Sequence, residues 1–132
     1  MDLIKISPDK ERAISILKMT SLLEERIKSQ NKSKMAVLIV SDYYEIIKEL
    51  ITAVLLADGY KTLSHKDLID YLKDKYSQFT ANEISILDDL RILRNRITYE
   101  GFLIEVSYLN RNEHLFKYII NKLKNILNIK LK

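Results

Sequence analysis

The sequence predicts an all-α fold, a five-helix up-and-down bundle, and three observations indicate it. Apolar residues recur at helical spacing along most of the chain. Helix-start signals stand at Ser7, Ser64 and Thr80. The chain has only two glycines and one proline, so few positions interrupt an element. At 132 residues, with 47% hydrophobic and 30% charged residues, we expect residues 1–132 to form one domain with a single core.

The first helix is predicted from its start signal. Residues 1–6 are expected to be irregular, and Ser7 is then expected to cap a helix that has Pro8 and Asp9 in its first turn. The helix should run to about residue 29. Its apolar side is expected at Ile14, Leu17, Leu22 and Ile27.

The second helix, predicted over residues 34–58, is apolar almost all round and ends at Gly59. Such a helix is either central to the bundle or shared between the core and a subunit interface. Asp42, Glu45 and Glu49 form one of its few polar strips. This strip is explained either as a solvent-facing surface or as a set of carboxylates placed near the arginines described below.

Two capping boxes predict the starts of the third and fourth helices. Ser64 with Asp67 starts a helix that ends near residue 76, after a turn at residues 59–63. Thr80 with Glu83 starts the next helix. No sheet is expected.

The fourth helix carries the densest cationic stretch of the chain. Arg91, Arg94 and Arg96 fall within six residues, and Gly101 follows where a helix C-terminus favours positive φ. The apolar face is expected at Leu87, Leu90, Leu93 and Ile97. The plain interpretation is that these arginines are solvated or paired with neighbouring carboxylates.

The fifth helix is predicted over residues 107–128, after a packed turn at residues 102–104. Its C-terminal half is basic through Lys117, Lys122, Lys124, Lys130 and Lys132. Cations at this end suit the helix dipole, and we prefer that explanation to an RNA-binding tail.

Composition narrows the classes of function. The net charge of +4 and the pI of about 9.2 weakly favour a polyanionic partner. The chain has no cysteine, and His65 and His114 lack zinc-ligand spacing, so no metal site is expected. We interpret His65 as structural. The longest apolar run, residues 35–40, is too short to cross a membrane, so a cytoplasmic protein without a membrane partner is expected.

The Arg94-Asn95 pair, followed after three residues by Tyr99 and then by Gly101, resembles the signature of the HEPN family, the higher eukaryotes and prokaryotes nucleotide-binding domains. In that family an arginine, usually followed by asparagine, stands four to six residues before a histidine. Tyr99 takes the place of that histidine here. The stretch over residues 59–66 is similar to the family as well.

The resemblance implies a helical bundle that forms a two-fold dimer, with a composite cleft between the protomers. It implies a metal-independent endoribonuclease of the toxin–antitoxin type, acting on RNA or a nucleotide, and no cofactor. The implied site residues are Arg94, Asn95 and Tyr99 in catalysis, with Arg91, Arg96 and either Asp42 or Glu45 on the phosphate.

Tyr99 fits the histidine role poorly, because a phenol has a pKa of about 10 against about 6.5 for histidine. It could act as a general acid, or as a base if Arg94 and Arg96 lower its pKa. It could instead stack on a base, donate a hydrogen bond to a phosphate, or only pack the helix end. In a regular helix, Arg94 and Tyr99 also point about 140° apart.

Two other functions stay open at this point. One is a non-catalytic HEPN module that binds a nucleotide or docks on a minimal nucleotidyltransferase partner, and the other is a structural dimer with a decayed site.

Overall fold

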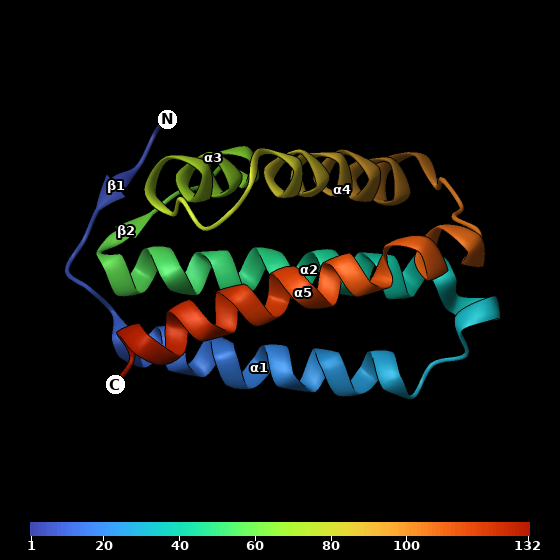
Figure 1. Ribbon diagram of the computed structural model, residues 1–132, viewed down its shortest axis with the longest axis horizontal. Coiled ribbons are helices and arrows are strands. Elements are labelled where there is room, and N and C mark those ends of the chain that lie inside the picture. Colours follow the sequence, from blue (N-terminus) through green and yellow to red (C-terminus); the bar gives the residue numbers. More distant parts are fainter.

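The computed structural model describes residues 1–132, and five helices account for most of them (Figure 1). The helices are α1 (Lys10–Lys28), α2 (Lys32–Asp58), α3 (His65–Lys75), α4 (Ala81–Glu100) and α5 (Val106–Lys130). The all-α prediction is confirmed.

The prediction that no sheet forms is wrong in one detail. The strands β1 (Ile4–Lys5) and β2 (Tyr60–Lys61) pair antiparallel, where an irregular lead and a turn were expected. Gly59 adopts a φ of 90°, and its carbonyl accepts a hydrogen bond of 2.9 Å from the Ile6 N–H. The left-handed turn after α2 therefore brings β2 alongside the N-terminal segment.

The five helices form an up-and-down bundle with four antiparallel positions, because two consecutive helices together occupy one of them (Figure 1). Along the chain α1, α2, the α3–α4 pair and α5 alternate in direction, so α5 runs the same way as α2, and α1 and α5 both pack on α2. α3 and α4 follow one another along the opposite edge, so together they occupy the remaining position. Both chain termini lie at the same end of the bundle (Figure 1).

α2 is the central helix, as its sequence predicts. Leu50, Ala53 and Val54 are fully buried, and α2 contacts all four other helices. Its N-cap is Asn31, whose side chain accepts a 3.0 Å hydrogen bond from the Lys34 N–H. The backbone at Met35 is non-helical, so the first turn is kinked away from the rest of α2.

The start of α1 differs from the prediction. Asp9, not Ser7, is the N-cap, because the Asp9 carboxylate accepts a 3.1 Å hydrogen bond from the Arg12 N–H. The buried side of α1 also differs: Ala13 and Thr20 face the bundle with Ile27, whereas Ile14 and Leu22 are exposed.

One capping box is complete and the other is not. Thr80 and Glu83 exchange both of the expected hydrogen bonds at the start of α4. Ser64 accepts from the Asp67 N–H, but the Asp67 carboxylate accepts from the backbone N–H of Asp2 instead of returning to Ser64. The predicted reciprocal box at α3 is therefore wrong, because the N-terminal segment takes its acceptor.

The predicted apolar face of α4 is only partly covered. Leu87 and Leu90 are buried, whereas Leu93 and Ile97 are half-buried. The second half of α4 therefore packs less completely than the first. Gly101 ends the helix with a φ of 65°, as predicted.

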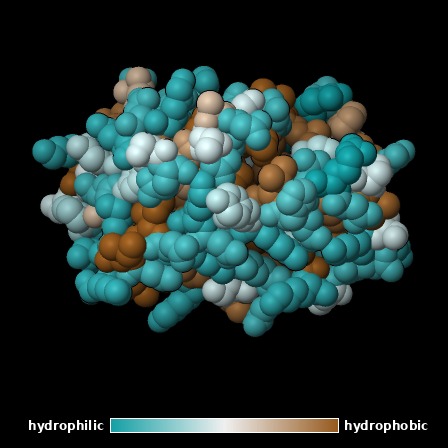
Figure 2. Space-filling model, in the orientation of Figure 1, coloured by the Kyte–Doolittle hydropathy of each residue, from teal (hydrophilic) through white to brown (hydrophobic).

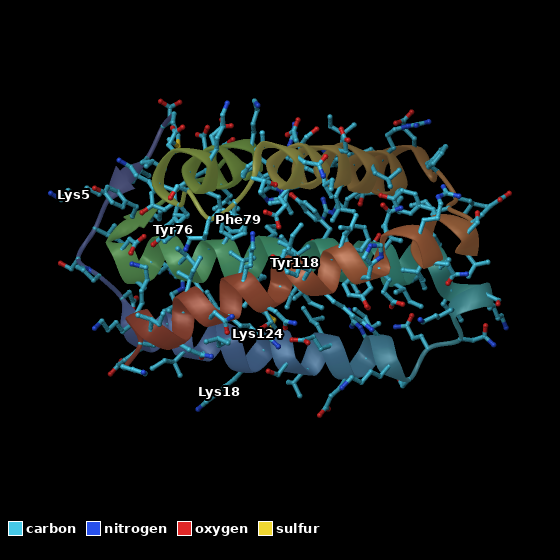
Figure 3. The ribbon with its side chains drawn as sticks, viewed as in Figure 1. Lys5, Lys18, Tyr76, Phe79, Tyr118 and Lys124 are labelled. Atoms are coloured by element: carbon cyan, nitrogen blue, oxygen red, sulfur yellow. The ribbon has the colours of Figure 1, made fainter.

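The lysines of α5 are tied across the bundle. Lys122 bonds to Glu83 at 2.7 Å and lies over the rings of Phe79 and Tyr118. Lys124 points from α5 toward α1 and pairs with Glu24 (Figure 3). Lys130 pairs with Asp58 at 2.5 Å. These three cations fasten α5 to its neighbours, which is a more specific structural role than the predicted interaction with the helix dipole.

The surface facing the viewer is mostly hydrophilic, and its hydrophobic residues lie in separate patches (Figure 2). No helix combines the length and the apolar character that a membrane crossing requires.

Candidate functional site

Arg94 lies in a polar cluster where α2, α3 and α4 meet. The cluster, called the Arg94 cluster below, consists of Tyr44, Glu45, Lys48, His65 and Arg94. Arg94 Nη2 donates to Glu45 Oε1 at 3.0 Å, and the Arg94 Cζ lies 5.7 Å from the centroid of the Tyr44 ring. The Arg94 side chain is 21% exposed. Most of its five N–H donors therefore stay available for a second partner.

Glu45 is shared between two cations. Its Oε2 atom lies 2.7 Å from Lys48 Nζ, while its Oε1 atom accepts from Arg94. Lys48 is also 3.4 Å from Glu49. An incoming anion would meet Arg94 and Lys48 together, and Glu45 is the group that it would have to displace or share.

His65 joins the cluster through Tyr44. The Tyr44 hydroxyl lies 3.2 Å from His65 Nδ1 and has no other hydrogen-bond partner. Tyr44 is buried, and a buried hydroxyl needs an acceptor for its proton. We therefore assign the O–H as the donor to Nδ1, which places the proton of the neutral ring on Nε2.

The charge states of both groups agree with this assignment. Burial, followed by the nearby cations Lys48 and Arg94, lowers the pKa of His65, so its ring is neutral at pH 7. Burial raises the pKa of Tyr44 to about 12, so its hydroxyl keeps its proton. The His65 ring is thus a neutral group close to two cations.

The other arginines of α4 have partners of their own. Arg91 donates through Nε to Asp88 Oδ1 at 3.0 Å. Arg96 lies 3.6 Å from Glu100 and stacks over the Phe102 ring at 4.0 Å. The structure does not bring either of them to the Arg94 cluster as an unpaired cation.

Asn95 and Tyr99 lie apart from Arg94. α4 stays helical through Glu100, so no distortion of the last turn brings Tyr99 round to Arg94. Tyr99 is 78% exposed, whereas Arg94 faces α2. Asn95 is half-buried and makes no hydrogen bond through its side chain. Within one protomer, the predicted catalytic trio therefore does not form one site.

The choice between the two carboxylates of α2 is resolved by geometry. Glu45 contacts Arg94, whereas Asp42 faces α1 and accepts two hydrogen bonds from Arg26, at 3.1 and 2.7 Å. Of the two alternatives, only Glu45 lies beside Arg94, because Arg26 of α1 takes both carboxylate oxygens of Asp42.

Sequence reasoning missed Tyr44, Lys48 and His65 as members of this cluster. In the sequence, Tyr44 looks like one more core position of α2. His65 directly follows the N-cap Ser64, so its position is explained by the start of α3 alone. The spacing from Glu45 to Lys48 was a usable signal, since positions three apart share a helix face. No group of three or more histidine, cysteine, aspartate or glutamate side chains is arranged to hold a metal ion.

Comparisons with protein-family models, curated proteins and solved structures find no match to this chain. Its function is therefore inferred from its own residues and their geometry.

Proposed function

We propose that this protein is an HEPN-type module that binds a phosphate group of RNA or of a nucleotide at the Arg94 cluster. One observation supports this most directly: Arg94 is held in place by Glu45 and Tyr44 and uses few of its donors. A guanidinium that is positioned in advance can grip two phosphate oxygens at once. Lys48, which shares Glu45 with Arg94, would supply a further donor.

In this proposal the site is completed in a two-fold dimer. α4 exposes apolar side chains, with Ile92 47% and Tyr99 78% exposed, and Leu103 just after the helix is 78% exposed. Ile92 and Tyr99 are seven residues apart and so share one face of α4. Exposed apolar side chains on one face support an interface, and a two-fold axis there would place two α4 helices against each other.

Cleavage of RNA would then use groups from both protomers. The ribose 2′-OH would attack the phosphorus and lose its proton to solvent while the bond from phosphorus to the 5′ oxygen breaks. Arg94 would stabilise negative charge on the scissile phosphate, and Tyr99 would donate its phenolic proton to the leaving oxygen and regain one from water. This chemistry needs no metal ion, so cleavage should survive a chelator. The same α4 face would instead serve as a docking surface if the protein is a non-catalytic partner of a minimal nucleotidyltransferase.

One panel of variants tests the proposal. Wild type, Arg94→Ala, Tyr99→Phe and Tyr99→His are assayed for binding and cleavage of a labelled single-stranded RNA, with and without chelator. Arg94→Ala should weaken binding, Tyr99→Phe should abolish cleavage while leaving binding intact, and Tyr99→His should raise cleavage because histidine titrates near neutrality. Equal binding by wild type and Arg94→Ala would reject the phosphate site.

The oligomeric state is checked separately by light scattering at micromolar concentration. A dimer mass is expected, and it should fall to the monomer mass in Ile92→Glu, which places a charge on the exposed face of α4. A monomer mass for wild type would rule out the composite cleft.

A further inference from the structure

A second candidate site lies on the other side of α2 from the Arg94 cluster. It is a cavity of about 460 Å³ between the end of α1, the first half of α2 and the middle of α5. α3 and α4, which carry His65 and Arg94, lie along the opposite edge of the bundle (Figure 1). The cavity is within the size range of small-molecule sites.

The inner wall of the cavity is apolar and fixed. Ile27 and Ile120 are buried and line it. Tyr43, also buried, donates through its hydroxyl to Glu113 Oε2 at 2.7 Å. Burial and this hydrogen bond raise the pKa of Tyr43, so the hydroxyl stays protonated and the contact persists.

Glu113 is already satisfied and does not call for a ligand of its own. It accepts from Lys32 at 2.5 Å as well as from Tyr43. Burial alone would raise the pKa of Glu113, but these two hydrogen bonds leave it below its ordinary value, so the carboxylate stays ionised. The Tyr43–Glu113–Lys32 chain thus forms a preorganised wall.

Three other groups at the cavity lack partners. Lys28 and Lys117 line it, and neither lies within ion-pairing distance of a carboxylate, whereas Lys32 and Lys124 are both paired. Gln30 Oε1 is buried and accepts no hydrogen bond. A buried acceptor without a donor costs free energy, which a ligand N–H would recover.

We infer that this cavity binds a small organic anion that also carries N–H donors. Its phosphate or carboxylate lies between Lys28 and Lys117, its N–H group donates to Gln30 Oε1, and its apolar or planar body packs on Ile27 and Ile120. An anion without N–H donors leaves Gln30 unpaired, and a neutral compound leaves both lysines unpaired. Ligands that have both features therefore bind more tightly than either half alone.

The test compares whole compounds with their halves. The phosphate arm uses adenosine 5′-monophosphate against adenosine and inorganic phosphate, and the carboxylate arm uses indole-3-acetate against indole and acetate. Binding is followed by NMR through the shifts of the Tyr43 and Ile120 signals, at ligand concentrations up to the millimolar range. At least one whole compound should bind about tenfold more tightly than either of its halves.

Variants locate the binding. Lys28→Gln combined with Lys117→Gln should weaken the bound compound by about tenfold, since two charge-assisted contacts are lost. Asn121→Trp, at an exposed position on the rim, should fill the cavity and block binding without touching the core. Lys18→Gln is the matched control, because Lys18 is on α1 and points away from the bundle (Figure 3).

Three results would overturn the inference. The first is that neither whole compound moves the Tyr43 or Ile120 signals. The second is that binding survives both the lysine and the tryptophan variants, and the third is that Arg94→Ala removes it, because in either case the compound would bind elsewhere. The RNA-binding assay on the Arg94 cluster is a separate measurement, so the two sites succeed or fail separately.

Discussion

Two arginine–carboxylate pairs join α2 to different helices, Asp42 to Arg26 of α1 and Glu45 to Arg94 of α4, and they differ in how completely the arginine is used. Asp42 is 8% exposed and accepts from Arg26 through both of its oxygens. Glu45 accepts a single hydrogen bond from Arg94 and also serves Lys48. Arg26 is the more exposed of the two arginines, yet its donors are engaged by a carboxylate that has few other partners.

This difference suggests that the Arg26–Asp42 pair is structural, whereas the Arg94–Glu45 pair can exchange partners. Removing Arg26 leaves the nearly buried Asp42 with only the long 3.5 Å contact from Gln30. Removing Arg94 leaves Glu45 with Lys48. The Arg26–Asp42 pair is therefore expected to hold α1 to α2, while Arg94 can exchange part of its contact with Glu45 for a phosphate.

The largest expected effect is on RNA binding. Arg94→Ala should weaken the binding of a short single-stranded RNA by about 1.5–3 kcal/mol, or roughly ten- to a hundredfold, because a charge-assisted contact is lost. Fluorescence anisotropy at fixed low salt measures it. Arg26→Ala removes the same charge and should change affinity far less; an equal loss in both variants would mean that binding follows net charge alone.

In folding stability, Arg26→Ala should have the larger effect and Arg94→Ala the smaller one. Arg26→Ala should lower the free energy of unfolding by about 1–3 kcal/mol, because a nearly buried carboxylate loses both of its close donors. Arg94→Ala should cost under about 1 kcal/mol, as is usual for a partly exposed pair. Urea denaturation followed by circular dichroism compares the two, and a larger cost for Arg94→Ala would assign it the structural role.

Replacing each carboxylate by an amide compares the two pairs in a second way. Glu45→Gln should tighten RNA binding by about three- to tenfold, since the amide competes less well than a carboxylate for Arg94 and Lys48. Asp42→Asn should give no gain in affinity. A loss of affinity in Glu45→Gln would instead show that Glu45 is needed to position Arg94.

The local part of this structure is predictable from sequence, whereas the choice of partners is not. The Thr80–Glu83 box and the glycines after α2 and α4 act through neighbouring residues, so their prediction needed no tertiary information. Whether Asp42 or Glu45 meets Arg94 depends on which helix packs on each side of α2. That packing is a long-range property, and the spacing of the two residues alone leaves it open.

The catalytic prediction shows the same limit at shorter range. Arg94 and Tyr99 match the spacing of a linear motif, but the turn of a regular helix sends them in different directions. His65 reaches the Arg94 cluster only because α3 packs on α2 beside Tyr44. Because His65 is the first residue of α3, the local helix start was enough to explain it, and nothing in the sequence indicated its contact with Tyr44.

The smallest expected effect concerns the response of stability to pH. Burial and then Lys48, Arg94 and Arg91 lower the pKa of His65 below its ordinary value of 6.5, while Glu45 opposes them. The unfolded chain therefore binds a proton at this residue at a higher pH than the folded chain does. The stability linked to His65 is fully present above the ordinary pKa, and it is lost as the pH falls toward the lower, folded value.

Wild type should accordingly lose stability as the pH falls through the range in which histidine titrates, and His65→Gln should remove that part of the loss. Urea denaturation at a series of pH values gives the comparison, with His114→Gln as the control for simple removal of a histidine. The difference should be smaller than the effect of Arg26→Ala, because His65 is only half-buried and solvent weakens its interaction with the cations. Parallel pH profiles for wild type and His65→Gln would mean that the cations of the Arg94 cluster do not act on His65, and His65 would then have no place in the proposed phosphate site.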